Sequence, residues 1–203
     1  MSESARPFVP AISTLAGFEA PGRESYDALA ALVPVGETVG VVVDEPPEPM
    51  PAWSLLHEAR LLQMVFGPKK AEGPRHEFVE LTAADSPEMV ALADLTKPGP
   101  FGSRTHEFGG YIGIRRGSSL AAMAGYRMRV PGFTEISAVC THPDHAGKGY
   151  ARSLTNALIA RIIASNETPF LHVREGNERA VQLYERMGFY TRYRGRFLVL
   201  RRI

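Results

Sequence analysis

The residues best suited to binding a phosphate lie in the stretch from Val139 to Ala151. Two glycines, Gly147 and Gly149, stand there in a turn just before a segment whose apolar residues recur with helical spacing. Glycine lets backbone N–H groups approach a ligand closely, and a helix N-terminus adds unpaired donors and a positive dipole end. The stretch therefore suits a phosphate or diphosphate, although plain strand–turn–helix connections use glycine about as often.

Two familiar phosphate-binding loops do not fit these residues. A dinucleotide-binding loop needs three glycines in a G-x-G-x-x-G pattern, and this turn has two. A P-loop needs a glycine five residues before Gly147 and a Ser or Thr after Lys148, whereas Gly149 follows Lys148. The turn belongs to neither class.

Two segments resemble the signatures of the GNAT superfamily of N-acetyltransferases. The first, from Val139 to Ala151, reads V-C-T-H-P-D-H-A-G-K-G-Y-A and is similar to the family pattern V-x-P-x-x-R/Q-G-x-G-x-G/A. The second, from Asn177 to Phe189, reads N-E-R-A-V-Q-L-Y-E-R-M-G-F and is similar to N-x-x-A-x-x-L-Y-E-x-x-G-F. The resemblance is strong over residues 107–203, extends back to residue 75 and is absent before it.

The resemblance implies acetyl-CoA as the acetyl donor and no metal. It assigns cofactor binding to Val139, Cys140, Thr141, Ala146, Gly147, Lys148, Gly149, Tyr150, Ala151, Arg152, Asn177 and Tyr184. Ala146 departs from the family pattern, because the family has Arg or Gln before the first glycine. We expect the backbone donors to hold the pyrophosphate without it, helped by the charge of Lys148, although a lysine in a turn is by default solvated.

Acetyl transfer to an amine needs a proton acceptor for the amine, a donor for the carbonyl oxygen and a proton for the leaving thiolate. Tyr184 matches the family tyrosine near the CoA sulfur and is the candidate acid; its helical spacing alone would suit a core aromatic. Glu135 is the candidate base, because several members of the family place a carboxylate at this point of the central strand. Partial burial would raise its pKa toward the working range. In other members ordered waters take the place of the base. The alternative without a catalytic role is that Glu135 is a solvated acid at the end of a strand.

Other residues have weaker claims to chemistry. The Val139 N–H should face the thioester carbonyl if its strand splays from its neighbour, as the family implies. Asn177 either binds the cofactor or simply caps a helix. His142 and His145 fall in a turn without further ligands, so no metal site is expected. Cys140 is expected to be packed within a strand and not to act as a nucleophile.

The elements that position these residues follow from periodicity and turn residues. We expect strands at 77–81, 110–115, 120–130, 135–139 and 169–173, and helices from 85 or 86 to 95, at 151–162 and at 177–187. A final hairpin is expected from strands 190–194 and 197–201 turning at Gly195. The fold class is α+β, with a mixed, mostly antiparallel central sheet flanked by helices.

The first 74 residues carry no catalytic pattern and are expected to form an N-terminal extension, with residues 75–203 as the acetyltransferase domain. Residues 25–33 predict a short helix, 38–43 a strand and 53–64 a second helix, while 45–51 and 69–74 should be irregular. The extension is too small for a core of its own. It should pack on the catalytic domain, beside residues 75–81 or over the acceptor cleft.

Composition bounds the surroundings of the protein. The chain has 203 residues, 44% hydrophobic content and a formal net charge of +1, as in an ordinary soluble globular protein. The near-neutral charge offers no case for nucleic acid or an anionic membrane, and no apolar run reaches the ~20 residues that span a bilayer. A single cysteine and the lack of a secretion signal favour the cytoplasm.

These observations together predict an acetyl-CoA-dependent N-acetyltransferase that works by direct transfer in a ternary complex. The acceptor is left open among a small-molecule amine, a peptide N-terminus and a lysine, as is a homodimer. Residues 97–107 and the 194–196 turn are expected to shape the acceptor pocket. The alternatives are a catalytically silent GNAT-fold module that binds CoA or a small ligand, and an enzyme that transfers a longer acyl chain or acts on a hydroxyl.

Overall fold

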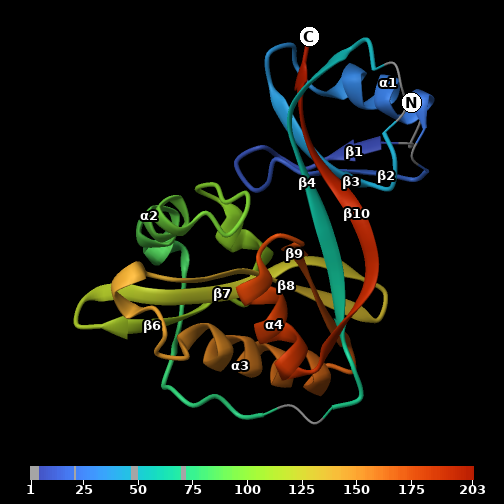
Figure 1. Cartoon of the computed structure of the whole chain (residues 1–203). Helices are drawn as coiled ribbons and strands as arrows, with labels where there is room; N and C mark the ends of the chain where they lie inside the picture. Colours follow the sequence, from blue (N-terminus) through green and yellow to red (C-terminus); the bar gives the residue numbers. More distant parts are fainter. Residues whose placement is uncertain (1–4, 21, 47–49, 70–71) are drawn as a thin grey trace.

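The computed structural model describes residues 5–20, 22–46, 50–69 and 72–203, and an eight-stranded mixed sheet runs through them (Figure 1). The strand order is β3-β10-β4-β9-β8-β7-β6-β5, and only β8 and β9 pair in parallel. The strands are β3 (Thr38–Val43), β4 (Trp53–Phe66), β5 (Val79–Glu80), β6 (Ile112–Arg116), β7 (Ser119–Val130), β8 (Phe133–Thr141), β9 (Thr168–Arg174) and β10 (Phe189–Arg202). A separate hairpin joins β1 (Ala5–Pro7) to β2 (Ala16–Phe18).

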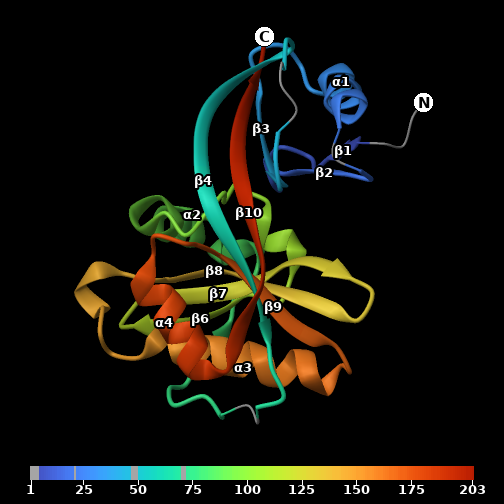
Figure 2. The ribbon, with the colours of Figure 1, turned by 45° about the vertical axis from the view of Figure 1, so that its right-hand side comes forward.

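Within the described residues, four α-helices accompany the sheet, and the predicted α+β architecture is confirmed. They are α1 (Arg23–Leu32), α2 (Ser86–Thr96), α3 (Tyr150–Ala164) and α4 (Glu178–Met187). Helices α3 and α4 cover one face of the sheet and α2 lies on the other (Figure 2). The main core, which includes Leu154, Leu158, Leu171 and Met187, lies under α3 and α4, and a smaller core around Met89 and Leu92 lies under α2.

The segment 53–64 is not a helix as predicted, but most of the long strand β4. Its leucines, glutamate and arginine suit a helix by propensity, yet β4 pairs with β10 along its whole length and with β9 over residues 61–65. Alternation is visible near its end, where Leu62, Met64 and Phe66 are buried in the main core. Tertiary pairing therefore overrides the local preference.

The predicted hairpin at Gly195 is also wrong, because β10 continues through it as one strand. A Cβ atom at Gly195 would lie 2.7 Å from the ring of Tyr193, so this glycine allows a close side-chain approach and does not turn the chain. Of the predicted strand 77–81, only Val79–Glu80 is a strand. The expected irregular segments 45–51 and 69–74 include residues 47–49 and 70–71, which lie outside the described residues.

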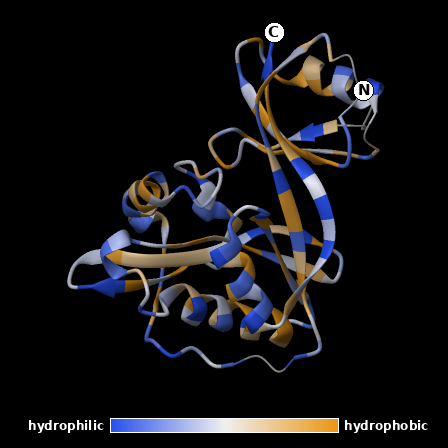
Figure 3. Ribbon diagram, in the orientation of Figure 1, coloured by the Kyte–Doolittle hydropathy of each residue, from blue (hydrophilic) through white to orange (hydrophobic). Residues whose placement is uncertain are grey.

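The N-terminal extension packs on the catalytic part, as predicted, through the upper ends of β4 and β10. These two strands rise together out of the main body and carry β3 and α1 (Figures 1 and 2), with hydrophobic and hydrophilic residues interspersed along them (Figure 3). A second core joins Tyr26 and Leu29 of α1 to Trp53, Leu198 and Leu200. Strand β3 lies at the sheet edge opposite β5, so the suggested pairing beside residues 75–81 is wrong.

Candidate functional site

The sheet opens between β8 and β9. Their parallel ladder pairs Phe133 with Thr168 and ends where Glu135 pairs with Phe170. Beyond this point the two strands line opposite sides of a cleft, β8 with residues 136–141 and β9 with residues 171–174. The two strands therefore splay apart from this point, which is the condition on which the expected position of the Val139 N–H depends.

The diverging part of β8 contains a β-bulge. Met123 pairs with Cys140 and Gly125 with Ser137, so Ala138 and Val139 together face the single residue Ala124. Ala138 has a φ of +52°, a left-handed backbone conformation that costs a residue with a side chain roughly 1 kcal/mol. The bulge takes Val139 out of regular pairing, and Val139 lines the cleft wall.

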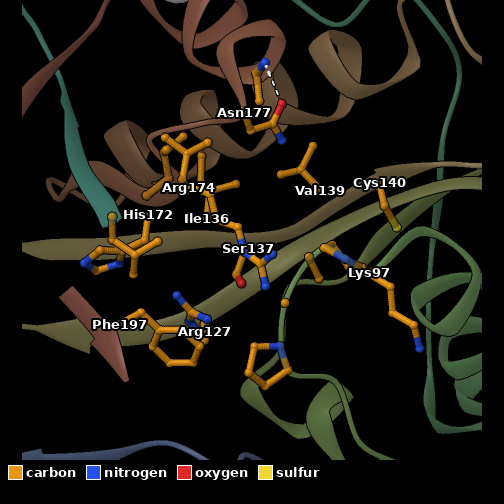
Figure 4. Close-up of a pocket in the computed structure, with 18 of the residues that line it drawn as sticks. Lys97, Arg127, Ile136, Ser137, Val139, Cys140, His172, Arg174, Asn177 and Phe197 are labelled. Atoms are coloured by element: carbon orange, nitrogen blue, oxygen red, sulfur yellow. Dashed lines mark hydrogen bonds between the residues drawn. The ribbon is translucent and has the colours of Figure 1, made fainter. Parts of the chain in front are cut away.

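The cleft has a volume of about 460 Å³ and passes between the two strands (Figure 4). Of the predicted site residues, Val139, Cys140, Thr141, Asn177 and Tyr184 line it. They come from β8, the loop before α4 and α4 itself. The two sequence signatures therefore meet in space on either side of one opening.

Tyr184 reaches the cleft from the buried face of α4. It is 7% exposed and packs edge-on against Phe189. Burial raises the pKa of its phenol above the usual value, so the hydroxyl carries its proton at neutral pH. Burial likewise raises the pKa of the Cys140 thiol to about 11, which favours a packed, protonated cysteine.

Glu135 is not the partly buried acid with a raised pKa that the sequence predicted. It is fully buried, and it is not among the described residues that line the cleft. Burial alone would raise its pKa, but the charge of Arg127 and hydrogen bonds from His172 and Arg127 lower it to about 2. Arg127 Nε donates to Glu135 Oε2 at 2.9 Å and Nη2 donates to Oε1 at 2.5 Å.

His172, which the sequence analysis did not identify, connects Glu135 to the cleft. Its Nδ1 lies 2.7 Å from Glu135 Oε1, and its Nε2 lies 3.3 Å from Nε2 of Gln63. Gln63 Oε1 accepts from Arg192 at 2.8 Å, which turns the amide NH₂ group toward the histidine. Consistent donors and acceptors along this chain assign the imidazole proton to Nδ1 and leave the Nε2 lone pair as acceptor. His172 lines the cleft, as Figure 4 shows.

The glycine turn precedes α3 as predicted. Gly147 and Gly149 each have a φ of +80°, which a residue with a side chain adopts only with strain. A Cβ atom at Gly147 would meet nothing within 4 Å, and one at Gly149 would meet only His76 at 3.9 Å. The backbone of the turn is thus open on this side, just before the first residue of α3, Tyr150.

Several predicted cofactor-binding side chains near the turn already have protein partners. Arg152 pairs with Glu72 at 2.9 Å, and the Tyr150 hydroxyl accepts from Arg116 Nε at 2.7 Å. The Lys148 ammonium lies 3.2 Å from Nδ1 of His145. Asn177 accepts from the Ala180 N–H at 3.2 Å, a helix N-cap bond that leaves its amide NH₂ group free for a ligand. Ala146 ends the short helical turn at 143–145.

Further segments outside the signatures complete the cleft. Lys97 to Pro100, which belong to the expected acceptor segment 97–107, line it, and Phe197 lines it in place of the 194–196 turn. Leu15 and Val42 of the N-terminal extension also line it. The loop before Leu15 is fixed to the catalytic part, since Arg104 N–H donates to Ala11 O at 3.0 Å and the Thr105 hydroxyl to Ile12 O at 2.6 Å. The extension therefore forms part of the cleft wall.

Within the described ranges, no cluster of three or more His, Cys, Asp and Glu side chains is arranged to hold a metal ion. The helices in the same residues are too short or too polar to cross a membrane.

Comparison with known proteins completes the description. The family model described as FR47-like protein matches residues 111–198. A crystal structure from Novosphingobium aromaticivorans, described as an acetyltransferase of the GNAT family, is similar to this chain, with 34% identity and a TM-score of 0.90. The match covers 100% of this chain and 90% of the Novosphingobium chain.

Two more distant structures establish the fold alone. A GCN5-related N-acetyltransferase from Kribbella flavida has 16% identity, coverage of 95% of this chain and 83% of its own, and a TM-score of 0.61. A protein from Drosophila melanogaster has 17% identity, coverage of 92% and 69%, and a TM-score of 0.68. No curated protein matches the chain.

Proposed function

Because the chain belongs to the GNAT family of acetyltransferases, we propose that it is an acetyl-CoA-dependent N-acetyltransferase. The acetyl group would pass directly to an amine while both substrates are bound. The observation that carries this proposal is the opening between β8 and β9, where Tyr184 and the bulged backbone of Val139 line one cleft. A thioester placed there would have a proton donor and an amide donor beside it.

The residues present fit acetyl-CoA. The backbone at Gly147 and Gly149 is open, and both glycines lie just before the start of α3, whose first N–H groups have no partner within the helix, an arrangement suited to a pyrophosphate. From the turn, β8 runs back along the cleft to Val139, so a pantetheine arm could lie along it. The bound thioester supplies the activated acetyl group, and the Arg or Gln missing at Ala146 is compensated by these backbone donors.

Two groups of this chain would act on the thioester. The Val139 N–H donates to the carbonyl oxygen and stabilises the negative charge that develops on it. The Tyr184 hydroxyl donates its proton to the sulfur as the bond to the acetyl carbon breaks. Burial keeps this phenol protonated, which is the form that the step requires.

The proton of the incoming amine needs an acceptor at the cleft wall, and we assign this task to Glu135 acting through His172. The Glu135 carboxylate has a low pKa and bonds to Arg127, so it is a poor acceptor itself. It instead holds the His172 proton on Nδ1, so that Nε2, once its lone pair is released from the Gln63 NH₂ group, takes the proton from the amine. The resulting imidazolium would lie 2.7 Å from the carboxylate, which stabilises it.

The rival is a catalytically silent module with the same fold, and Ala146 is the residue that favours it. One experiment separates the two. Acetyl-CoA is titrated against thermal unfolding, and a panel of amines is then assayed for release of free CoA thiol. At about one hundred times Kd, acetyl-CoA should stabilise the fold by ~2.7 kcal/mol. Binding without turnover of amines, alcohols or longer acyl donors would support the silent module, and no binding at millimolar acetyl-CoA would refute both the enzyme and a silent module that binds CoA.

A further inference from the structure

We propose that the acceptor side of the cleft contains a carboxylate-binding subsite centred on Arg174, so that the acceptor is an amine that also carries a carboxylate. This inference rests on the proposed acetyl transfer and specifies its substrate class. It starts from the charges around the cleft. Among the described residues that line it, Lys97, Arg127, Arg174 and Arg179 are cationic and none is Asp or Glu.

Two of these cations are already neutralised within the protein. Lys97 lies 3.1 Å from Asp94, and Arg127 is paired with the buried Glu135. Arg174 differs, because no described acidic side chain lies within ion-pair distance of it. Its neighbour in sequence, Glu175, pairs with Arg194 instead. Arg174 therefore brings an uncompensated positive charge to the cleft.

The alternation of β9 places Arg174 on the acceptor face of the sheet. Leu171 and Val173 are buried in the main core, which lies under α3 and α4. Residues one position away project to the opposite face, so Arg174 shares its face with His172. Arg179, the other unpaired cation, belongs instead to the first turn of α4, beside Asn177. Of the two, Arg174 is the one placed to meet the acceptor, and Figure 4 shows it at the cleft.

The remaining wall of the acceptor side is apolar. Leu15 and Val42 from the extension, together with Leu61 and Phe197 from the long strands, contribute hydrocarbon surface. A carboxylate would be bound by a guanidinium fork, and an apolar body would fill the space beside it. The class that fits is a primary amine with both a carboxylate and an apolar portion, such as an apolar amino acid, a short peptide or an ω-amino acid.

Matched acids and amides test this directly. The probes are phenylalanine, leucylglycine and 6-aminohexanoate, each compared with its carboxamide, because the distance from amine to carboxylate is left free. The acid and the amide differ in amine pKa, and N-acetylation removes this difference. Binding of the N-acetylated products is therefore measured by calorimetry, with and without CoA. The value of kcat/KM is measured for the amines. For at least one pair, the acid should be favoured by about 10-fold or more in both measurements.

The variant Arg174→Gln should abolish this preference, lowering kcat/KM for the acid by about 10-fold or more and leaving the amide almost unchanged. Arg201→Gln is the matched control, because Arg201 is an exposed arginine of β10 outside the cleft, and it should keep the preference. Equal use of acids and amides by the parent, or an unchanged preference in Arg174→Gln, would overturn the subsite while acetyl transfer stands. Weaker acetyl-CoA binding in Arg174→Gln with the preference intact would assign Arg174 to the cofactor.

Failure of the proposed function gives a different pattern. If no amine is acetylated, the calorimetric comparison still decides the subsite: acid products that bind better than their amides, through Arg174, would keep it as a ligand site of a silent module. The subsite would be refuted if the acid and amide products bind equally, or if neither binds up to about 20 mM. That concentration corresponds to only about 2 kcal/mol of binding free energy.

Discussion

Nδ1 of His172 lies 2.7 Å from Oε1 of Glu135, and this pair joins two strands that have stopped hydrogen-bonding to each other. The ladder between β8 and β9 ends where Glu135 pairs with Phe170, and His172 follows Phe170 by two residues on β9. A side-chain bond thus spans the point where the sheet opens. It ties the orientation of an imidazole at the cleft wall to a fully buried carboxylate, which is held in turn by Arg127.

The variant His172→Gln should reduce turnover by about 10²-fold or more, because it removes the proposed proton acceptor. Binding of acetyl-CoA and the melting temperature should stay close to those of the parent. The variant keeps the charged and hydrogen-bonding groups around the ring. These are Glu135 and Gln63, which face it, and Arg127 and Arg192 behind them. His57→Gln, at an exposed histidine of β4, is the control. Turnover at the parent rate in His172→Gln would show that the histidine is not the acceptor.

The low pKa of Glu135 predicts how stability depends on pH. Because the folded pKa, about 2, is below the ordinary value of 4.5, the ionised carboxylate stabilises the fold above about pH 4.5, and this contribution is lost as pH falls toward 2. Glu135→Gln should therefore cost about 3–5 kcal/mol at pH 7, because it leaves Arg127 buried without its partner. Denaturant unfolding from pH 7 to pH 2 measures both proteins, whose stabilities should converge in acid. A constant difference at every pH would contradict the assignment.

The variant Tyr184→Phe removes one hydroxyl and leaves the ring packed against Phe189. Turnover should fall on the order of 10²-fold, while acetyl-CoA affinity and melting temperature change little, because the lost interaction forms as the thiolate leaves. Tyr190→Phe, at an exposed tyrosine of β10, should have no effect on either. If Tyr184→Phe turns over at the parent rate, Tyr184 contributes packing only.

Cofactor binding at the glycine turn can be separated from backbone strain. Gly147→Val should remove most of the stabilisation by acetyl-CoA, since its side chain would fill the open space above the turn. Gly132→Val is the matched control, because Gly132 has the same φ of +80° and is also free of contacts, but lies in the turn between β7 and β8. Both variants should lose similar intrinsic stability, and only Gly147→Val should lose the response to acetyl-CoA. Equal responses would place the pyrophosphate elsewhere.

The features predicted correctly are those that neighbouring residues determine. The turn at Gly147 and Gly149, the α4 helix between Asn177 and Gly188, and the strand before the turn are local patterns, so the sequence was sufficient for them. The acceptor-side loop after Lys97 could be placed because prolines and glycine end the α2 helix there.

The features that were missed depend on contacts distant in sequence. Nothing near Glu135 in the chain indicates that Arg127 would neutralise it, or that His172, 37 residues later, would bond to it. Alternation at Leu62 and Met64 is a signal of a strand, but the helix-forming residues before it carry more weight in a local reading. Gly195 resembles a turn glycine until the ring of Tyr193 is seen to occupy the space of its missing side chain.

The last prediction concerns the boundary proposed at residue 75. A chain shortened to residues 75–203 would lack β4, which lies between β9 and β10, and β3, which covers the outer edge of β10. It would also expose Leu198 and Leu200, which are fully buried against the extension. We expect this chain to be insoluble, or to unfold well below the full-length protein and fail to bind acetyl-CoA.

A milder deletion provides the comparison. Residues 37–203 keep both strands but lose α1, the β1–β2 hairpin and Leu15. This chain should fold and bind acetyl-CoA, with a lower melting temperature because Trp53 and Leu200 lose their cover, and with weaker acceptor selectivity because Leu15 leaves the cleft wall. If residues 75–203 alone melt with the full chain and keep its acetyl-CoA affinity, β4 is dispensable and the extension is only an appendage of an independent catalytic domain.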